Sequence, residues 1–173
     1  MNPNIFIQEF ERTDNTDKLH AILGRALIVA TRFDSICKQA ALHNGLKKEI
    51  GIYLVNDDEA RSRVLQSVAD KHRTLSLRIQ SLLLPKDVSA LLDDARKARN
   101  AIAHELSEGL TGCLDFKINE GELIKRVYDL VLSLAYGDVV ISQVMSVLNN
   151  EPQPRADFLS SYVNNVTRWV IER

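Results

Sequence analysis

The fold is decided by residues 14–45, DNTDKLHAILGRALIVATRFDSICKQAALHNG, where apolar side chains recur every three or four positions. With about 3.6 residues per turn, this spacing puts them on one face of a helix. The apolar positions are Leu19, Ile22, Leu23, Ala26, Val29, Ala30, Phe33, Ile36, Cys37 and Ala40. Acidic, Asn and Thr residues at 14–17 are typical of a helix start, and Asn44-Gly45 is typical of a helix end. The sequence therefore predicts one long amphipathic helix between these two signals.

The same periodicity predicts further helices along the chain. They are a second helix from Asn56-Asp57 through Leu82, stopped by Pro85; a third from Val88 through Leu106, ending near Gly109; a fourth from Leu123 to Leu148, after a turn at Asn119-Glu120-Gly121 and broken by Asn149-Asn150-Glu151-Pro152-Gln153-Pro154; and a short fifth helix over 156–171, with Phe158 among its apolar positions. Residues 113–118 alternate weakly and predict a short extended segment, while 46–56 fit either an extended segment or a helical turn. Long helices with short connections pack as antiparallel neighbours.

The expected fold is thus all-α, a four- to five-helix up-and-down bundle in a single domain over 1–173. Residues 1–13 would form an N-terminal arm, 14–148 the bundle core and 155–173 a C-terminal helix. Composition agrees, because seven Gly and four Pro in 173 residues are about half the usual share, which means few turns. The length suits one core and is short for two typical domains.

Charge and cysteine content exclude several classes of protein. Lys and Arg number 22 against 23 Asp and Glu, so a broadly basic, histone-like nucleic-acid binder is excluded, although a local basic patch is not. We expect no membrane association, because no apolar run approaching about 20 residues is evident. The N-terminus, MNPNIFIQEFERTDN, lacks a secretory signal pattern. Two cysteines, Cys37 and Cys113, make no disulfide framework, which favours the cytoplasm.

The third predicted helix carries the most unusual set of polar residues, in ARKARNAIAHE at 95–105. At about 100° per residue, Arg99 falls in the middle of the apolar stripe. A guanidinium there must be paired, extended toward solvent or used, because burying it alone is costly. Asn100 and His104 are four residues apart and share another face, with Arg96 between that face and Arg99.

Two interpretations of this pattern stay open from spacing alone. In the structural one, Arg99 pairs with an acid on a neighbouring helix and His104 is a solvated helix residue. In the functional one, the three side chains form a site at the border of the core.

The hexapeptide RNAIAH, Arg99 to His104, resembles the motif of HEPN domains, the helical domains of higher eukaryotes and prokaryotes. That motif is an Arg, then a polar residue that is very often Asn, a short gap and a His. The family fold is an all-α up-and-down bundle with the motif on a late core helix, which agrees with the periodicity over residues 14–148.

The resemblance implies a metal-independent endoribonuclease of the toxin–antitoxin or defence type, which needs no cofactor. It implies a homodimer in which two copies of His104 and Arg99 meet, with Asn100 as a third catalytic residue. Histidine suits general acid and base roles near neutral pH, and arginine suits a phosphate. We expect Arg96 and Lys97 to bind the substrate RNA, and a nucleotidyltransferase-like or other antitoxin to be the partner of a toxin.

The same resemblance also allows a non-catalytic helical interaction or regulatory module, in which Arg99 and Asn100 only support the bundle. The second predicted helix adds cationic side chains that would form a basic rim or a solvated face: Arg61, Arg63, Lys71, His72, Arg73 and Arg78. We expect no metal site, because HELSE at 104–108 has Glu108 where H-E-x-x-H needs a second His, and no Glu stands three residues before any His.

Overall fold

The computed structural model describes residues 14–48, 57–106 and 119–172, which are helical throughout apart from short connections. Its elements are α2 (Asp14–Lys48), α3 (Asp58–Lys71), α4 (Leu75–Ser81), α5 (Lys86–Asn100), the π-helical turn η2 (Ala101–Glu105), α7 (Glu120–Asn149) and α8 (Ala156–Glu172). The predicted all-α class is confirmed. The N-terminal arm, Gly109, Cys113 and the extended segment expected at 113–118 lie outside the described residues.

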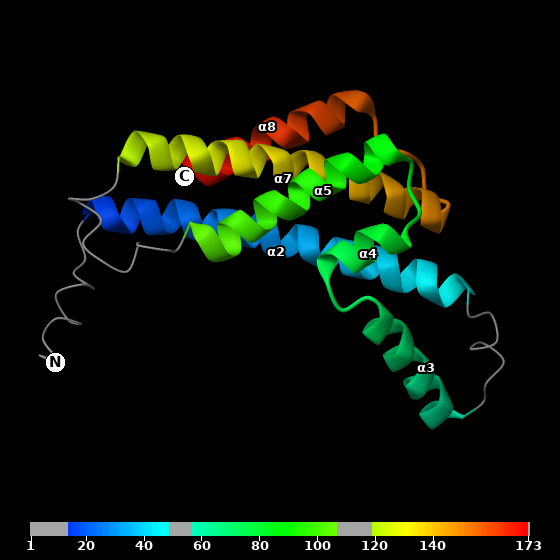
Figure 1. Cartoon of the computed structure of the whole chain (residues 1–173). Coiled ribbons are helices and arrows are strands. Elements are labelled where there is room, and N and C mark those ends of the chain that lie inside the picture. The colour runs from blue at the N-terminus through cyan, green and yellow to red at the C-terminus, as the bar shows by residue number, and fades with distance from the viewer. Residues whose placement is uncertain (1–13, 49–56, 107–118, 173) are drawn as a thin grey trace, which may run out of the picture.

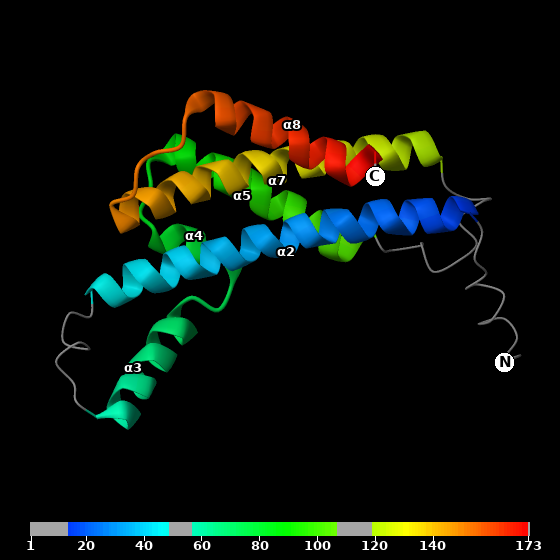
Figure 2. The same cartoon turned by 180° about the vertical axis from the view of Figure 1, so that it is seen from behind.

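The long helices run up and down as predicted (Figure 1). The chain passes along α2, returns through α5, crosses again in α7 and comes back in α8. Seen from behind, α8 lies against α7 and above α2 (Figure 2). Helix α3 points away from the bundle and contacts it near the C-terminal end of α2.

The core lies where α2, α5 and α7 meet. Its largest fully buried side chains include Phe33 from α2, Leu92 from α5 and Leu134 from α7. Gly137 on α7 marks a close approach of the three helices, because a Cβ there would lie 2.3 Å from the Ala95 Cβ and 3.0 Å from the Phe33 Cε2. The absence of a side chain at Gly137 thus sets how near the helices α2 and α5 come to α7.

Several helix ends follow the predicted signals. Pro85 precedes the first residue of α5, where its missing N–H costs no hydrogen bond. Asn150 ends α7 in the left-handed conformation, with φ 56°. Asn119, expected to form a turn with Glu120 and Gly121, instead caps α7, and its side chain accepts from the Glu122 N–H.

The predicted end of the first helix is wrong. Asn44-Gly45 lies inside α2, which continues to Lys48. Gly45 serves packing there, because a Cβ would lie 2.6 Å from the Val68 Cγ1 of α3. Tertiary contact with α3 therefore overrides the local stop signal.

The predicted second helix is two helices, α3 and α4, joined by a corner at His72–Thr74. The Thr74 hydroxyl accepts from the Leu77 N–H, 3.3 Å away, and starts α4. Arg78 donates to the carbonyl oxygens of His72 and Arg73, at 2.9 and 3.3 Å. These donors satisfy carbonyls that a continuous helix would have used, so the corner is stable.

Helix α7 corrects the expectation of no membrane-length apolar segment. It is the one described helix that is long and apolar enough to cross a membrane by length and composition, so the described residues do not form a many-span membrane protein. It packs against α2, α5 and α8, and it carries Asp138, whose buried carboxylate accepts from Arg32 Nε at 2.8 Å. A central core helix has the same composition as a membrane span, and α7 occupies that central place.

Helix α8 is held by apolar and polar contacts. Val163, Thr167 and Val170 are buried, whereas Phe158, expected on the apolar face, is 60% exposed. The Tyr162 hydroxyl donates to Asp138 on α7. Burial and this hydrogen bond raise the pKa of Tyr162 to about 12.

Candidate functional site

Three of the predicted site residues lie in contact where α5 passes into η2. The Arg99 guanidinium donates through Nη1 to the Asn100 Oδ1, 3.2 Å away. The same Nη1 lies 3.5 Å from the His104 Nε2. The Arg99 side chain is half-buried and the His104 side chain is exposed, so the cluster is open to solvent.

The π-helical turn brings His104 to Arg99. The Leu106 N–H donates to the Ala101 carbonyl, five residues back, at 2.9 Å. On a regular α-helix, residues five apart point about 140° away from each other. The wider turn inserts one extra residue, so positions five apart lie nearly above one another. The prediction at 100° per residue did not include the contact between Arg99 and His104, because it was based on an uninterrupted α-helix.

Arg99 also has a partner that the sequence analysis did not name. Its Nη2 lies 3.2 Å from Asp34 Oδ2 on α2, and the other oxygen of Asp34 accepts from Arg78 Nη1 at 2.5 Å. The three side chains are 27%, 25% and 15% exposed, for Arg99, Asp34 and Arg78. A signal did exist: Asp34 stands four residues after Ala30 and three before Cys37, at the border of the apolar stripe of α2.

A hollow of about 320 Å3 lies beside this ion pair, between the α3–α4 corner, α4 and α5. Asp34 and Asn100 line it together with four arginines, Arg73, Arg78, Arg96 and Arg99. Four guanidinium groups against one carboxylate make the lining strongly positive, which suits an anion.

The two residues predicted to bind substrate are placed differently. Arg96 lines the hollow, and its Nε lies 2.7 Å from Asp93. Lys97 does not line it, and its ammonium lies 3.0 Å from Asp93 and 3.2 Å from Asp94. Hydrogen bonds from Arg96 and Lys97 hold the pKa of Asp93 below its ordinary value.

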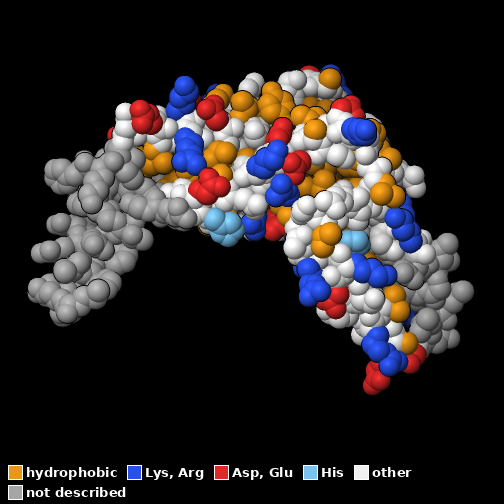
Figure 3. All heavy atoms as spheres, viewed as in Figure 1, with side chains coloured by type: hydrophobic (Ala, Val, Ile, Leu, Met, Phe, Trp, Pro, Cys, Tyr) orange, Lys and Arg blue, Asp and Glu red, His pale blue; other side chains and the backbone are white. Residues whose placement is uncertain are grey.

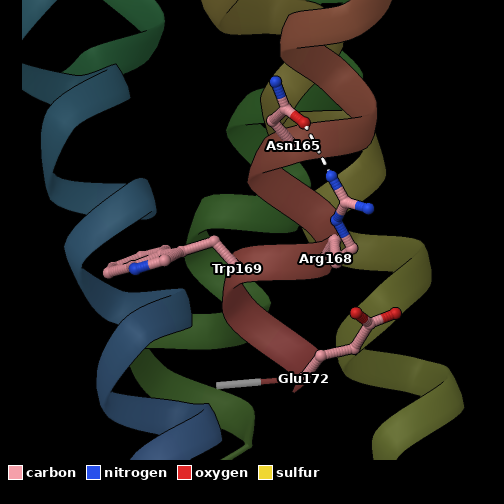
Figure 4. Close-up of a pocket in the computed structure, with 4 residues that line it drawn as sticks. All are labelled: Asn165, Arg168, Trp169 and Glu172. Atoms are coloured by element: carbon pink, nitrogen blue, oxygen red, sulfur yellow. Dashed lines mark hydrogen bonds between the residues drawn. The ribbon is translucent and has the colours of Figure 1, made fainter.

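Another hollow lies along α8 and does not join this cluster. Asn165, Arg168, Trp169 and Glu172 line it (Figure 4). Trp169 points toward α2, while Arg168 donates to Asn165 Oδ1 at 3.2 Å on the other side of the helix. All four residues come from one helix, and their arrangement suggests no particular chemistry.

Within the described residues, no group of three or more His, Cys, Asp or Glu is placed to hold a metal ion. No family model, curated protein or solved structure matches the chain.

Proposed function

We propose that this chain is a metal-independent endoribonuclease of the HEPN type, a cytoplasmic toxin or defence ribonuclease that acts as a homodimer. One observation carries the proposal: Arg99 touches both Asn100 and His104 at the edge of an arginine-lined hollow. A guanidinium next to an imidazole supplies a phosphate ligand and a proton carrier in one place.

The proposed reaction uses the ribose 2′-hydroxyl as the nucleophile. A general base takes the 2′-hydroxyl proton, the oxygen attacks the adjacent phosphorus, and the bond to the 5′-oxygen breaks. A general acid protonates that leaving oxygen, so the products are a 2′,3′-cyclic phosphate and a 5′-hydroxyl. The two copies of His104 in a dimer would take the two proton-transfer roles.

Arg99 and Asn100 have distinct roles in this proposal. The Arg99 guanidinium stabilises the negative charge that grows on the phosphate oxygens in the transition state. Asn100 holds the Arg99 Nη1 through its side-chain oxygen, which fixes the guanidinium near His104. A toxin of this kind needs a restraining partner, and an antitoxin of nucleotidyltransferase or other type would be that partner.

A second candidate function has one observation in its favour. Arg99 is ion-paired with Asp34, as a purely structural arginine would be. The chain would then be a non-catalytic interaction or regulatory module built on the same bundle. The two candidates differ in whether His104 is needed for any chemistry.

RNA cleavage by the purified protein in EDTA tests the proposal. We expect the wild type to cut single-stranded RNA and the H104A variant to lose about 10²-fold or more in rate, the usual range for a general acid–base group. The matched control is H20A, which removes another exposed histidine, on α2. Cleavage that survives H104A, or that disappears with EDTA, overturns the mechanism.

A growth assay separates the enzyme from the interaction module. Expression of the wild type should slow the host and R99A should relieve the effect, whereas an interaction module would be harmless in both forms. Sedimentation of the wild type then tests the homodimer that the two-histidine mechanism requires.

A further inference from the structure

The hollow beside Arg99 holds more cationic groups than one phosphodiester at His104 would need. Arg73, Arg78, Arg96 and Arg99 line it against the single carboxylate of Asp34. Because four positive groups gathered this closely repel one another, a further anion in the hollow would lower the energy of the arrangement.

The four arginines differ in how many of their N–H groups already have a partner within the protein. Arg78 is committed, since Asp34 and the carbonyls of His72 and Arg73 take its N–H groups. Arg96 pairs with Asp93, a carboxylate that it shares with Lys97. The part of the chain that the structure describes gives Arg73 no carboxylate within ion-pair distance, and its side chain is exposed.

Arg73 also joins the hollow to a second, shallower one on α3. Arg63 and Lys71 line that surface with Arg73, and Asp70 is its one acidic residue. Figure 3 shows Lys and Arg side chains on α3 as well as beside α4 and α5 on the same face. A cationic track therefore leads from Arg99 past Arg73 onto α3.

His72, in the corner between α3 and α4, gives independent evidence that this region is positively charged. Burial is the largest cause that lowers the pKa of His72, and the charges of Lys71, Lys48 and Arg78 lower this pKa further. All three charged groups that shift the pKa of His72 are cationic, so this corner favours an anion.

We propose that the arginine hollow binds a backbone phosphate of single-stranded RNA that flanks the phosphodiester at His104, and that the strand continues over Arg73 onto α3. This inference rests on the proposed ribonuclease function and assigns a substrate subsite to it. None of the residues lining the hollow is aromatic, so it offers no stacking surface for a base. An extended track of cations without aromatic rings suits the phosphate backbone rather than a single nucleotide.

Binding of a 2′-O-methylated single-stranded RNA tests the subsite separately from cleavage, since the methyl group removes the nucleophile. Fluorescence anisotropy over a salt series would compare the wild type with R73Q and R96Q. The matched control is R168Q, which removes the same charge from α8, a helix that contributes nothing to the hollow. Circular dichroism checks that each variant is folded.

We expect R73Q and R96Q each to lower the slope of log K against log salt by about 0.7, the value for one lost phosphate contact on a single strand. If the affinities converge at 1 M salt, this corresponds to about fivefold weaker binding at 0.1 M. R168Q should match the wild type. In the cleavage assay, R73Q should raise KM by a similar factor and affect kcat less.

The remaining outcomes each overturn either the RNA subsite or the ribonuclease function. If R73Q and R96Q bind like R168Q while the wild type cleaves RNA, the subsite is wrong and the ribonuclease stands. If the methylated RNA binds with the expected dependence on Arg73 but no cleavage occurs, the ribonuclease is wrong and the phosphate track stands. If inorganic phosphate or a mononucleotide binds through Arg73 and the RNA does not, the RNA subsite is overturned.

Discussion

Gly137 allows a sharp test of how the site is held together. Replacing it by Ala adds a Cβ 2.3 Å from the Ala95 Cβ, whereas carbon atoms in favourable contact are about 3.5–4.0 Å apart. The obstacle is a Cβ attached directly to the backbone of α5, which cannot rotate away, so α5 and α7 must separate by more than 1 Å. Ala95 lies one turn before Arg99, and Phe33 precedes Asp34, so the strain falls on the elements that bring this ion pair together.

Two opposing effects set the magnitude. Ala is a better helix former than Gly by about 1 kcal/mol, and overpacking a core costs about 1–3 kcal/mol. Because the clash is with fixed atoms, we take the upper part of that range and expect G137A to be less stable by about 1–2 kcal/mol. G24A is the matched control, since Gly24 is exposed on α2 with nothing within 4 Å, and it should gain about 0.5–1 kcal/mol.

Urea denaturation followed by circular dichroism would measure both variants. The expected gap of about 1.5–3 kcal/mol corresponds to a difference in Tm of about 3–12 °C in a chain of this size. A G137A protein as stable as G24A would refute the argument that the missing side chain at Gly137 sets the spacing of α5 and α7.

Two further predictions concern titratable groups that are partly or fully buried. Because the pKa of Tyr162 is about 12, stability from its contact with Asp138 should be complete below about pH 10 and lost as the pH rises through 12. An absorbance titration should show tyrosinate formation above pH 11 that Y162F lacks, and ionisation of all tyrosines together would contradict this. Burial, aided by the charge of Asp34, raises the pKa of the fully buried Cys37 thiol to about 12. In a C113S background, Cys37 should therefore stay unmodified by a thiol reagent at pH 8 until the protein unfolds, and rapid native labelling would count against its burial.

The helix ends show where local chemistry is sufficient and where it is not. Pro85 and Asn150 act through their own backbone preferences, so the sequence predicts their effects correctly. Gly45 does not end the helix, because the absence of a side chain there leaves room for Val68, a residue distant in the sequence. The break at His72–Thr74 depends on Arg78, which binds the carbonyls of the corner and Asp34 at the same time.

The candidate site divides in the same way. Arg99 is visible in the sequence because a charge on an apolar stripe needs an explanation. Its partner Asp34 lies 65 positions away, and periodicity of one helix cannot say which helix packs beside it. The arginine hollow likewise needs α4 and α5 to meet at the corner, a contact that no local pattern contains.

The all-α class, the up-and-down order of the long helices and the choice of Arg99, Asn100 and His104 as candidates could all be read from the sequence. These follow from periodicity and residue chemistry, which act over a few neighbouring positions. The folded chain adds three features: His104 meets Arg99 through a π-helical turn, Asp34 joins Arg78 and Arg99, and four arginines surround one hollow. These features depend on hydrogen-bond register within a helix and on pairing between helices, and both are settled by how the whole core packs.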